Sequence, residues 1–315
     1  MPGSGERHVI FGTGPAGSTL AELLASRGKQ VRCVNRSGRA SLPRGVEVVA
    51  GDVLDPMNAR QLCRDAAVVY HCANVHYAQQ VELMPRLASS ITEAAARAGA
   101  RLVVLDTLYV YGETHGAVMT EDTPMAAHTR KGRMRAELVA GYLEAQRAGR
   151  VRVSMGRAAD FYGPRVLNSA LGERVFPPAL RGKPMQLVGN IDLPHSFGYI
   201  GDVARGLATL GERDEALGRA WLLPVAPPVS QRGMAEKIAS QLGQPARVRT
   251  LPRLGARALG LFDSFMREFV EMFYQYTEPQ VVDSSAFEQA FGYGATPVDE
   301  GLAATIEWYR RREQQ

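Results

Sequence analysis

The sequence predicts an α/β fold built on a doubly wound parallel sheet, with a smaller C-terminal lobe for the substrate. Short β-forming runs alternate with longer helical segments over residues 1–163, which is typical of a parallel sheet covered by helices on both faces. Three closely spaced glycines follow the first of these runs. After Gly163 the prolines and glycines come too close together for long elements, so we expect the chain to leave the sheet there.

The elements of the first part follow from the spacing of apolar residues. Apolar runs predict strands over 8–11, 30–35, 46–51, 67–73, 101–106 and 151–156. Helical spacing predicts helices from Ala16 to Arg27, from Leu83 to Ala98 and from Arg133 to Ala148. We assign residues 1–163 mainly to the main domain.

Residues 164–315 are assigned mainly to the substrate lobe and to C-terminal helices. Segments near 197–224 return to the main domain, because 196–210 reads as a strand followed by a helix and 220–225 as a further strand. Amphipathic helices are predicted over 256–275 and 297–311.

Composition limits the class of protein. The chain has 315 residues, of which 45% are hydrophobic, enough to fill a large core. Its net charge of +5 is spread along the sequence, and the densest basic cluster, which contains Arg130, Lys131 and Arg135, is predicted to be a solvated helix face. We expect no nucleic-acid partner. No apolar run approaches a membrane span or a signal peptide, so we expect a cytoplasmic protein with no membrane partner. The three cysteines have no metal-ligand spacing, and no metal is expected.

The glycines after the first strand form a G-x-G-x-x-G pattern. A glycine turn between a strand and a helix lets backbone N–H groups approach a pyrophosphate, and a proline at the first helical position suits the start of that helix. The pattern predicts a Rossmann-type NADP-binding domain, with the phosphates held by Gly12, Thr13, Gly14, Pro15, Ala16 and Gly17.

The end of the second strand predicts which dinucleotide is bound. An acidic residue there would bind the ribose 2′-hydroxyl of NAD, whereas Asn35 and Arg36 offer an amide and a cation suited to a 2′-phosphate. Ser37 and Arg39 are further candidates for binding this phosphate. NADPH is therefore the predicted cofactor.

Six segments, in order, resemble motifs of the extended short-chain dehydrogenase/reductase family. They are GDVLDP at 51–56, YHCAN at 70–74, TLYVYG at 107–112, GRAADFYGP at 156–164, SFGYIGDVARG at 196–206 and FGYGATPVDEGLAATIEWYRR at 291–311. The resemblance covers nearly the whole chain. It implies that the cofactor also contacts Asp52, Val53, Cys72, Ala73 and Asn74. The glycine spacing is that of atypical members.

The resemblance also isolates a departure at the reacting centre. The family's catalytic serine or threonine falls on Thr107, while its tyrosine and lysine fall on Thr129 and Arg133. An aliphatic hydroxyl cannot reach the acidity of a phenol, so Thr129 is expected to donate a hydrogen bond without acting as an acid or base. Arg133 is expected to bond the cofactor ribose. Tyr109 shares an extended face with Thr107 and is a candidate replacement acid.

Different classes of function remain open. The first is an NADPH-dependent ketoreductase, similar to those of antibiotic biosynthesis, that reduces a conjugated or aromatic polyketide-like carbonyl whose own structure stabilises the oxyanion. The alternatives are a non-catalytic NADP(H) sensor and a nucleotide-sugar epimerase or dehydratase. The partner is a small molecule in the enzymatic cases, and the protein is expected to be a monomer or homodimer. The predicted substrate neighbours are His76, Tyr77, Asp160, Phe161, His195 and Tyr199.

Overall fold

The computed structural model describes residues 6–261 and 264–314, and the chain divides into two compact units. Unit 1 comprises the chain through Val110, together with Arg130–Arg157 and Val203–Trp221. Unit 2 comprises Tyr111–Thr129, Ala158–Asp202 and the chain from Leu222 onward. Both units are therefore built from separate segments. The assignment of cofactor binding to 1–163 and of substrate binding to 164–315 stays a prediction.

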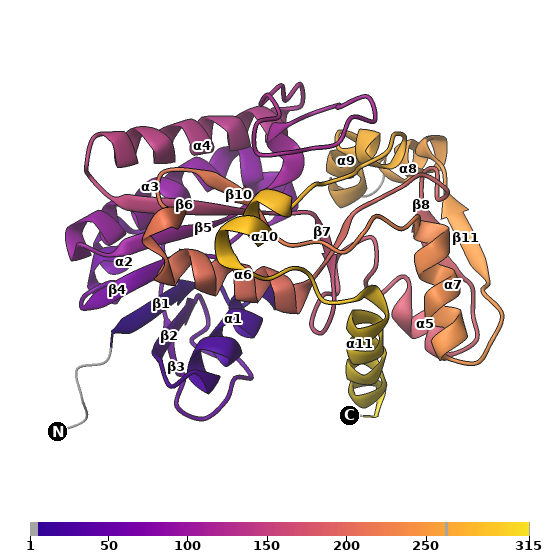
Figure 1. Ribbon diagram of the computed structural model, residues 1–315, viewed down its shortest axis with the longest axis horizontal. Helices are drawn as coiled ribbons and strands as arrows, with labels where there is room; N and C mark the ends of the chain where they lie inside the picture. The colour runs from indigo at the N-terminus through magenta and orange to yellow at the C-terminus, as the bar shows by residue number, and fades with distance from the viewer. Residues whose placement is uncertain (1–5, 262–263, 315) are drawn as a thin grey trace. The chain divides into compact units, whose positions relative to one another are not determined.

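Unit 1 is organised around a seven-stranded sheet in the order β10-β6-β5-β4-β1-β2-β3 (Figure 1). The pairs β1–β2, β1–β4, β2–β3 and β4–β5 are parallel. Phe11 is in register with Val34 on one side and with His71 on the other, so three neighbouring strands end at the same edge. The winding reverses at β1, which is where ligands bind in folds of this class. The strands are β1 (Arg7–Phe11), β2 (Gln30–Asn35), β3 (Glu47–Ala50), β4 (Ala66–His71), β5 (Arg101–Thr107), β6 (Arg152–Ala158) and β10 (Ala220–Leu222).

Helices cover both faces of this sheet, which confirms the predicted doubly wound α/β fold. On one face lie α1 (Pro15–Ser26) and α6 (Ile200–Glu212); on the other lie α2 (Pro56–Leu62), α3 (Gln80–Ala98) and α4 (Arg130–Arg147) (Figure 1). The short helix α2 was not predicted. Its N-cap residue Asp55 accepts a hydrogen bond from the backbone nitrogen of Met57 at 2.9 Å, a local signal at the start of a helix too short to show a periodic pattern.

Short 3-10 helices follow or precede several of these elements. They are η1 (Tyr77–Gln79), η2 (Leu108–Val110), η3 (Asp214–Ala216) and, in unit 2, η4 (Phe273–Tyr276). The first two come soon after the ends of β4 and β5, at the edge where the candidate site lies.

Unit 2 contains two small sheets. β7 (Asp160–Tyr162) pairs in parallel with β9 (Phe197–Tyr199), and β8 (Met185–Val188) pairs in parallel with β11 (Val248–Leu251). Its core includes Phe176, whose ring stacks on that of Tyr309 with centroids 5.1 Å apart. The helices are α5 (Phe176–Leu180), α7 (Gln231–Gln241), α8 (Arg253–Leu259), α9 (Ser264–Val270), α10 (Ser285–Phe291) and α11 (Val298–Glu313).

The predicted helix over 256–275 is not continuous. The structure divides that segment into α8, α9 and η4, while residues 262 and 263 lie outside the described part of the chain. Gly260 follows α8 directly, and a glycine weakens a helix because it gains no side-chain packing and loses the most backbone freedom. The predicted C-terminal helix over 297–311 is confirmed as α11.

Candidate functional site

The turn between β1 and α1 carries the glycines of the predicted dinucleotide site. Gly12 has a φ of +99°, and a Cβ atom there would lie 2.7 Å from the Cα atom of Ala73. A Cβ atom at Gly17 would lie 1.9 Å from the carbonyl oxygen of Gly12. At Gly14 a Cβ atom would meet nothing within 4 Å. Packing within unit 1 therefore requires glycine at 12 and 17, whereas Gly14 borders open space.

That open space lies at the N-terminus of α1. Gly14 is the N-cap residue and has no side-chain cap, and Pro15 takes the first helical position. The hydroxyl of Ser18 donates to the carbonyl oxygen of Thr13 at 3.0 Å, and Ala16 is buried beneath the turn. The first N–H groups of a helix carry partial positive charge and bind phosphate. These residues fit a nicotinamide dinucleotide, whose pyrophosphate they would hold.

Asn35 organises the loop that follows β2. Its side-chain nitrogen donates to the Thr13 hydroxyl at 2.8 Å and to the carbonyl oxygen of Arg39 at 2.9 Å. Its side-chain oxygen accepts from the backbone nitrogens of Ser37 at 3.0 Å and Gly38 at 2.7 Å. Both amide N–H groups are used inside the protein, so Asn35 shapes the loop and does not offer its amide to a ligand.

The arginines of the same loop are differently placed. Arg36 and Arg39 are exposed, and the side chain of Arg36 has no hydrogen-bond or ion-pair partner among the described residues. Asp52, at the end of β3, is exposed too, and its carboxylate accepts from the backbone nitrogen of Leu54 at 2.9 Å; Val53 beside it is half-buried. This rim of unit 1 therefore presents the exposed guanidinium groups of Arg36 and Arg39.

The segment after β4 closes the other side of the glycine turn. The backbone nitrogen of Cys72 donates to the carbonyl oxygen of Phe11 at 2.9 Å, which brings Ala73 against Gly12. Burial raises the pKa of the Cys72 thiol to about 12, so it is not a nucleophile at neutral pH. The side-chain oxygen of Asn74 accepts from the Gln80 side-chain nitrogen at 3.0 Å and therefore ties the loop to α3.

Thr107 ends β5 with an unsatisfied hydroxyl. Its Oγ1 atom is buried and has no hydrogen-bond partner among the residues that the structure describes. A buried polar group left without a partner costs about 1–3 kcal/mol, so such a group is a candidate for bonding a ligand. Tyr109, in η2, is half-buried. Thr107 thus remains the best-placed candidate donor to a reacting oxygen.

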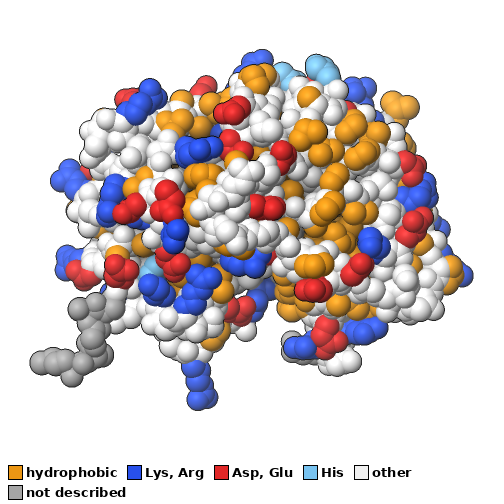
Figure 2. All heavy atoms as spheres, in the orientation of Figure 1, with side chains coloured by type: hydrophobic (Ala, Val, Ile, Leu, Met, Phe, Trp, Pro, Cys, Tyr) orange, Lys and Arg blue, Asp and Glu red, His pale blue; other side chains and the backbone are white. Residues whose placement is uncertain are grey.

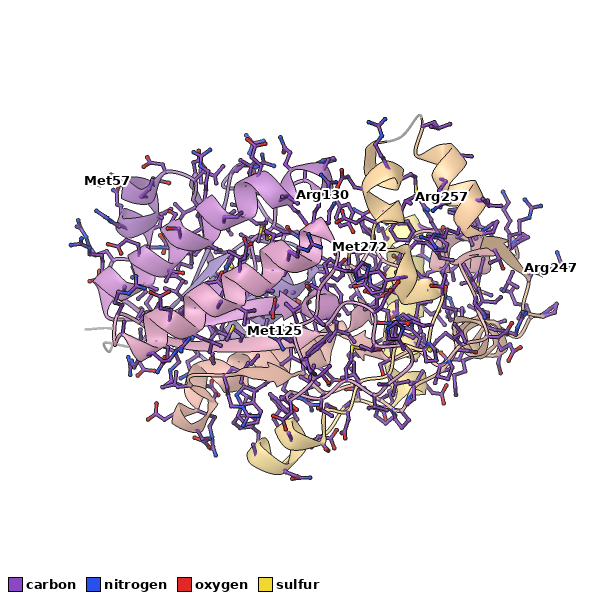
Figure 3. The ribbon with its side chains drawn as sticks, turned by 90° about the horizontal axis from the view of Figure 1, so that it is seen from above. Met57, Met125, Arg130, Arg247, Arg257 and Met272 are labelled. Atoms are coloured by element: carbon purple, nitrogen blue, oxygen red, sulfur yellow. The ribbon has the colours of Figure 1, made fainter. Side chains whose placement is uncertain are left out.

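The start of α4 carries the two residues that the family resemblance aligns with a tyrosine and a lysine, Thr129 and Arg133. The helix begins at Arg130 (Figure 3), and its phase leaves Arg133 exposed. The hydroxyl of Thr129 donates to the sulfur of Met272 at 3.5 Å, within unit 2. Lys131, by contrast, is 0% exposed and Arg135 is buried. The prediction that this basic cluster is a solvated face is wrong for both of these residues.

Lys131 is therefore the cation of this turn that faces the interior of unit 1. Its Nζ atom lies 4.6 Å from the centroid of the Tyr77 ring. Tyr77 is half-buried, while His76 beside it is exposed. The roles assigned to Thr129 and Arg133 stay predictions, but the structure favours Lys131 over Arg133 as a residue of the site.

In unit 2, Asp160, His195 and Tyr276 form a hydrogen-bonded group that we call the Asp–His–Tyr cluster. Oδ2 of Asp160 lies 3.2 Å from Nε2 of His195 and accepts from the Tyr276 hydroxyl at 3.0 Å. The His195 ring stacks on those of Phe197 and Tyr276, with centroids 4.4 and 5.9 Å away. Burial alone would raise the pKa of Asp160, but His195 and Tyr276 hold it below its ordinary value.

The other predicted substrate residues of unit 2 differ in their surroundings. Phe161 is half-buried beside Asp160 on β7. The ring of Tyr199 lies 5.8 Å from that of Tyr162, and Tyr199 packs against the core of unit 2. Burial and the nearby Asp202 carboxylate raise the pKa of Tyr199, so its hydroxyl keeps its proton at neutral pH.

Two residues of interest were missed by reasoning from the sequence. Lys131 was grouped with exposed basic neighbours, and only the starting residue of α4 reveals that its side chain faces inward. Tyr276 was not proposed as a site residue, because nothing in the sequence links it to Asp160, 116 positions away. Helical phase could have indicated the first; no local signal could have indicated the second.

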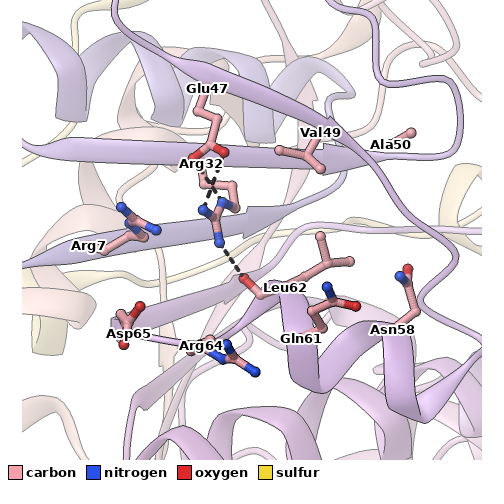
Figure 4. A pocket seen from close by; sticks show the side chains of 10 residues that line it. All are labelled: Arg7, Arg32, Glu47, Val49, Ala50, Asn58, Gln61, Leu62, Arg64 and Asp65. Atoms are coloured by element: carbon pink, nitrogen blue, oxygen red, sulfur yellow. Dashed lines mark hydrogen bonds and ion pairs between the residues drawn. The ribbon is translucent and has the colours of Figure 1, made fainter.

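A separate hollow in unit 1, of about 370 Å³, does not belong to this site (Figure 4). It is lined by residues of β1, β2, β3 and α2 and of the turn that follows α2. Arg32 is held there by Glu47, at 2.9 Å, and by the carbonyl oxygen of Leu62, at 3.1 Å. One pair of opposite charges in its wall is thus satisfied within the protein. Figure 2 shows Lys and Arg side chains interspersed with Asp and Glu on the visible face.

Over residues 6–261 and 264–314, no three His, Cys, Asp or Glu side chains are grouped so that they could hold a metal ion. In the same residues, no helix combines the length and the apolar character needed to cross a membrane.

Comparisons with known proteins agree with this architecture. UDP-glucuronic acid decarboxylase 1 of Arabidopsis thaliana is 27% identical over 235 residues, which is 65% of this chain and 52% of that protein. The chain thus spans about half the length of the curated relatives it matches.

Solved structures share the fold across nearly the whole chain. An epimerase from Methanothermobacter thermautotrophicus superposes with a TM-score of 0.83 at 19% identity, covering 98% of this chain and 94% of that one. UDP-glucuronic acid 4-epimerase from Bacillus cereus, in complex with UDP-glucuronic acid and NAD, gives 0.79 at 17% identity, covering 97% and 99%. At these identities the likeness shows the fold alone.

The sequence matches the model of one protein family, the NAD dependent epimerase/dehydratase family. It matches residues 9–222, which include the glycine turn, Thr107 and the whole of α4. The chain belongs to the NAD dependent epimerase/dehydratase family.

Proposed function

We propose that this protein is a nicotinamide dinucleotide-dependent oxidoreductase that acts on a nucleotide-linked sugar. The observation that carries the first part is the glycine turn, closed at Gly12 and Gly17 and open at Gly14. Family membership and the sugar nucleotides named for its relatives support the second part. These findings favour the nucleotide-sugar alternative over the ketoreductase of an aromatic polyketide, for which they offer no support.

Each part of the dinucleotide has candidate partners in unit 1. Gly14 and the first N–H groups of α1 would hold the pyrophosphate, and Asp52 would lie beside the adenine. Arg36 and Arg39 are exposed cations that suit a ribose 2′-phosphate. The last residue of β2 is Asn35, so no carboxylate is present there to repel that phosphate. We propose on this basis that NADP(H) binds more tightly than NAD(H).

The chemistry of such a site is reversible hydride transfer at a carbinol carbon. The bound nicotinamide supplies or accepts the hydride. Thr107 would donate a hydrogen bond to the reacting oxygen, because its hydroxyl is buried and without a protein partner among the described residues.

Two measurements test the proposal. Calorimetry with NADP⁺ and NAD⁺ should show saturable binding, tighter for NADP⁺. The protein is then incubated with each oxidised dinucleotide and with UDP-glucuronic acid, UDP-glucose or dTDP-glucose, and the products are separated by mass spectrometry and chromatography.

We expect a changed sugar with at least one nucleotide sugar. For comparison, the protein is incubated with a panel of quinones and aromatic ketones, each together with NADPH or NADH. Turnover confined to that panel would overturn the assignment to nucleotide sugars, and dinucleotide binding without turnover of any compound would support a sensor.

A further inference from the structure

A buried lysine and a half-buried tyrosine meet in unit 1. Lys131 is 0% exposed, and its Nζ atom lies 4.6 Å from the centroid of the Tyr77 ring. A cation over an aromatic face is attracted by about 0.5–2 kcal/mol, more when water is excluded. The contact therefore holds the two side chains together in a setting that excludes water from the lysine.

Both residues lie at the edge of the sheet that carries the dinucleotide turn. Tyr77 is in η1, shortly after β4 ends at His71, and His71 is in register with Phe11, the last residue of β1. Lys131 is in the first turn of α4, and α4 packs against η2, which directly follows Thr107 at the end of β5. The pair and the unsatisfied hydroxyl of Thr107 thus come from elements that follow the carboxyl ends of adjacent strands.

The loop that carries Tyr77 is anchored at both ends. Ala73 is held against Gly12, and Asn74 accepts hydrogen bonds from the Val75 backbone nitrogen at 2.9 Å and from the Gln80 side chain at 3.0 Å. Gln80, at the start of α3, is buried. The tyrosine is therefore carried by a fixed loop, as a catalytic group must be.

We propose that Tyr77 is the proton-transfer residue of this enzyme and that Lys131 is the residue that positions it. The pair would replace the tyrosine and lysine whose places in the sequence are taken by Thr129 and Arg133. This inference rests on the proposed function, since it assumes hydride transfer at the same edge of unit 1.

The proton balance of the reaction requires such a group. When a carbinol is oxidised, its carbon loses a hydride to the bound nicotinamide and its oxygen loses a proton as the O–H bond breaks and the C=O bond forms. The phenolate oxygen of Tyr77 takes up that proton and returns it in the reverse direction. The ammonium group of Lys131 stabilises the phenolate by its charge, and Thr107 bonds the substrate oxygen. Thr129 is not expected to take this part, since an aliphatic hydroxyl is far less acidic than a phenol.

Kinetics provide the first test. Tyr77→Phe should lower turnover by about 10²- to 10⁴-fold, the usual contribution of acid–base catalysis, with dinucleotide affinity unchanged. Lys131→Met should lower turnover with little change in KM, and Lys131→Arg should restore part of it because the charge is kept. The matched controls are Tyr293→Phe, a half-buried tyrosine of unit 2, and Arg147→Met, an exposed arginine of α4.

Optical titration provides the second test and needs neither substrate nor cofactor. The chain has 11 tyrosines, and the tyrosinate difference spectrum between the wild type and Tyr77→Phe isolates one of them. His76 and Glu82, the ionisable groups next to Tyr77 on its loop and at the start of α3, are exposed, whereas Lys131 lies over the Tyr77 ring. We expect the wild-type phenol to ionise at lower pH than the same phenol in Lys131→Met, with Tyr293→Phe leaving the signal in place.

The two tests separate this inference from the proposed function. A wild type that turns over no nucleotide sugar but shows the expected titration would refute the proposed function and leave the charged pair standing. Wild-type turnover that survives Tyr77→Phe within a few fold would overturn the inference and leave the function standing. It would also be overturned by a Tyr77 titration that Lys131→Met does not move, or by an effect of Arg133→Met as large as that of Lys131→Met.

Discussion

The glycine turn allows packing and ligand binding to be separated by single substitutions. Gly12→Ala places a methyl group 2.7 Å from the Ala73 backbone at a φ of +99°. Backbone strain of this kind costs about 1–3 kcal/mol, and overpacking costs about 1–3 kcal/mol more. Domains are stable by only about 5–15 kcal/mol, so the Gly12→Ala protein should unfold at a clearly lower temperature.

Gly14→Ala should behave in the opposite way. Its methyl group would meet nothing within 4 Å, and the backbone at Gly14, with φ −70° and ψ −172°, is open to alanine. We expect its stability to change by at most about 1 kcal/mol, since a poorer N-cap and a less flexible unfolded chain offset each other. If the methyl group keeps a phosphate from one helix N–H group, the loss of about 1.5–3 kcal/mol lowers dinucleotide affinity about 10- to 150-fold.

Thermal unfolding and calorimetric titration of NADP⁺ measure the two effects separately. We expect the Gly12→Ala protein to lose stability and the Gly14→Ala protein to lose affinity for NADP⁺ at nearly full stability. Wild-type affinity in a folded Gly14→Ala protein would refute the placement of the pyrophosphate at this turn.

Three further variants address other parts of the site. Arg36→Asp should reduce or reverse the preference for NADP⁺ over NAD⁺, because it replaces an exposed cation with a carboxylate suited to a ribose hydroxyl; equal changes in both affinities would contradict this. Thr107→Val should lower turnover about 10²- to 10³-fold through loss of a donor to the reacting oxygen, with unfolding temperature kept or raised because the hydroxyl has no partner among the described residues. Asp160→Asn should remove one contribution to the loss of folding stability at low pH. The folded-state pKa of Asp160 lies below its ordinary value, so its stabilising effect is complete above about pH 4 and is lost as pH falls through the folded-state pKa. Chemical unfolding of the wild type and the variant between neutral pH and pH 3 measures how the free energy of unfolding depends on pH. The same pH dependence in both proteins would exclude a stabilising role for the Asp160 carboxylate.

Local patterns predicted the parts of the fold that are determined locally. The strand before Gly12 and the helix after Pro15 follow from apolar periodicity and from the conformational demands of a tight turn, and both are confirmed. Alternation of such elements was enough to predict the parallel sheet. The division of 256–275 into shorter helices escaped prediction, because an amphipathic pattern continues across Gly260.

The candidate site was less accessible to sequence reasoning. The spacing of motifs aligned Thr129 and Arg133 with a tyrosine and a lysine, but it carried no information on which side chains of α4 are buried, and Lys131 is. The Asp160 contact with Tyr276 depends on how unit 2 folds over long sequence separations. Such contacts have no local signature, so only the three-dimensional structure could identify them.

The central claim is that this protein transfers a hydride between a nicotinamide dinucleotide and a nucleotide-linked sugar. Its most direct test is a single-turnover reaction with UDP-glucuronic acid, UDP-glucose or dTDP-glucose carrying deuterium on the ring carbons. The reaction is quenched in the first turnover, and the dinucleotide is analysed by mass spectrometry. We expect deuterium on the reduced nicotinamide with at least one of these sugars. Unlabelled dinucleotide with all of them, while an aromatic ketone oxidises NADPH, would contradict it.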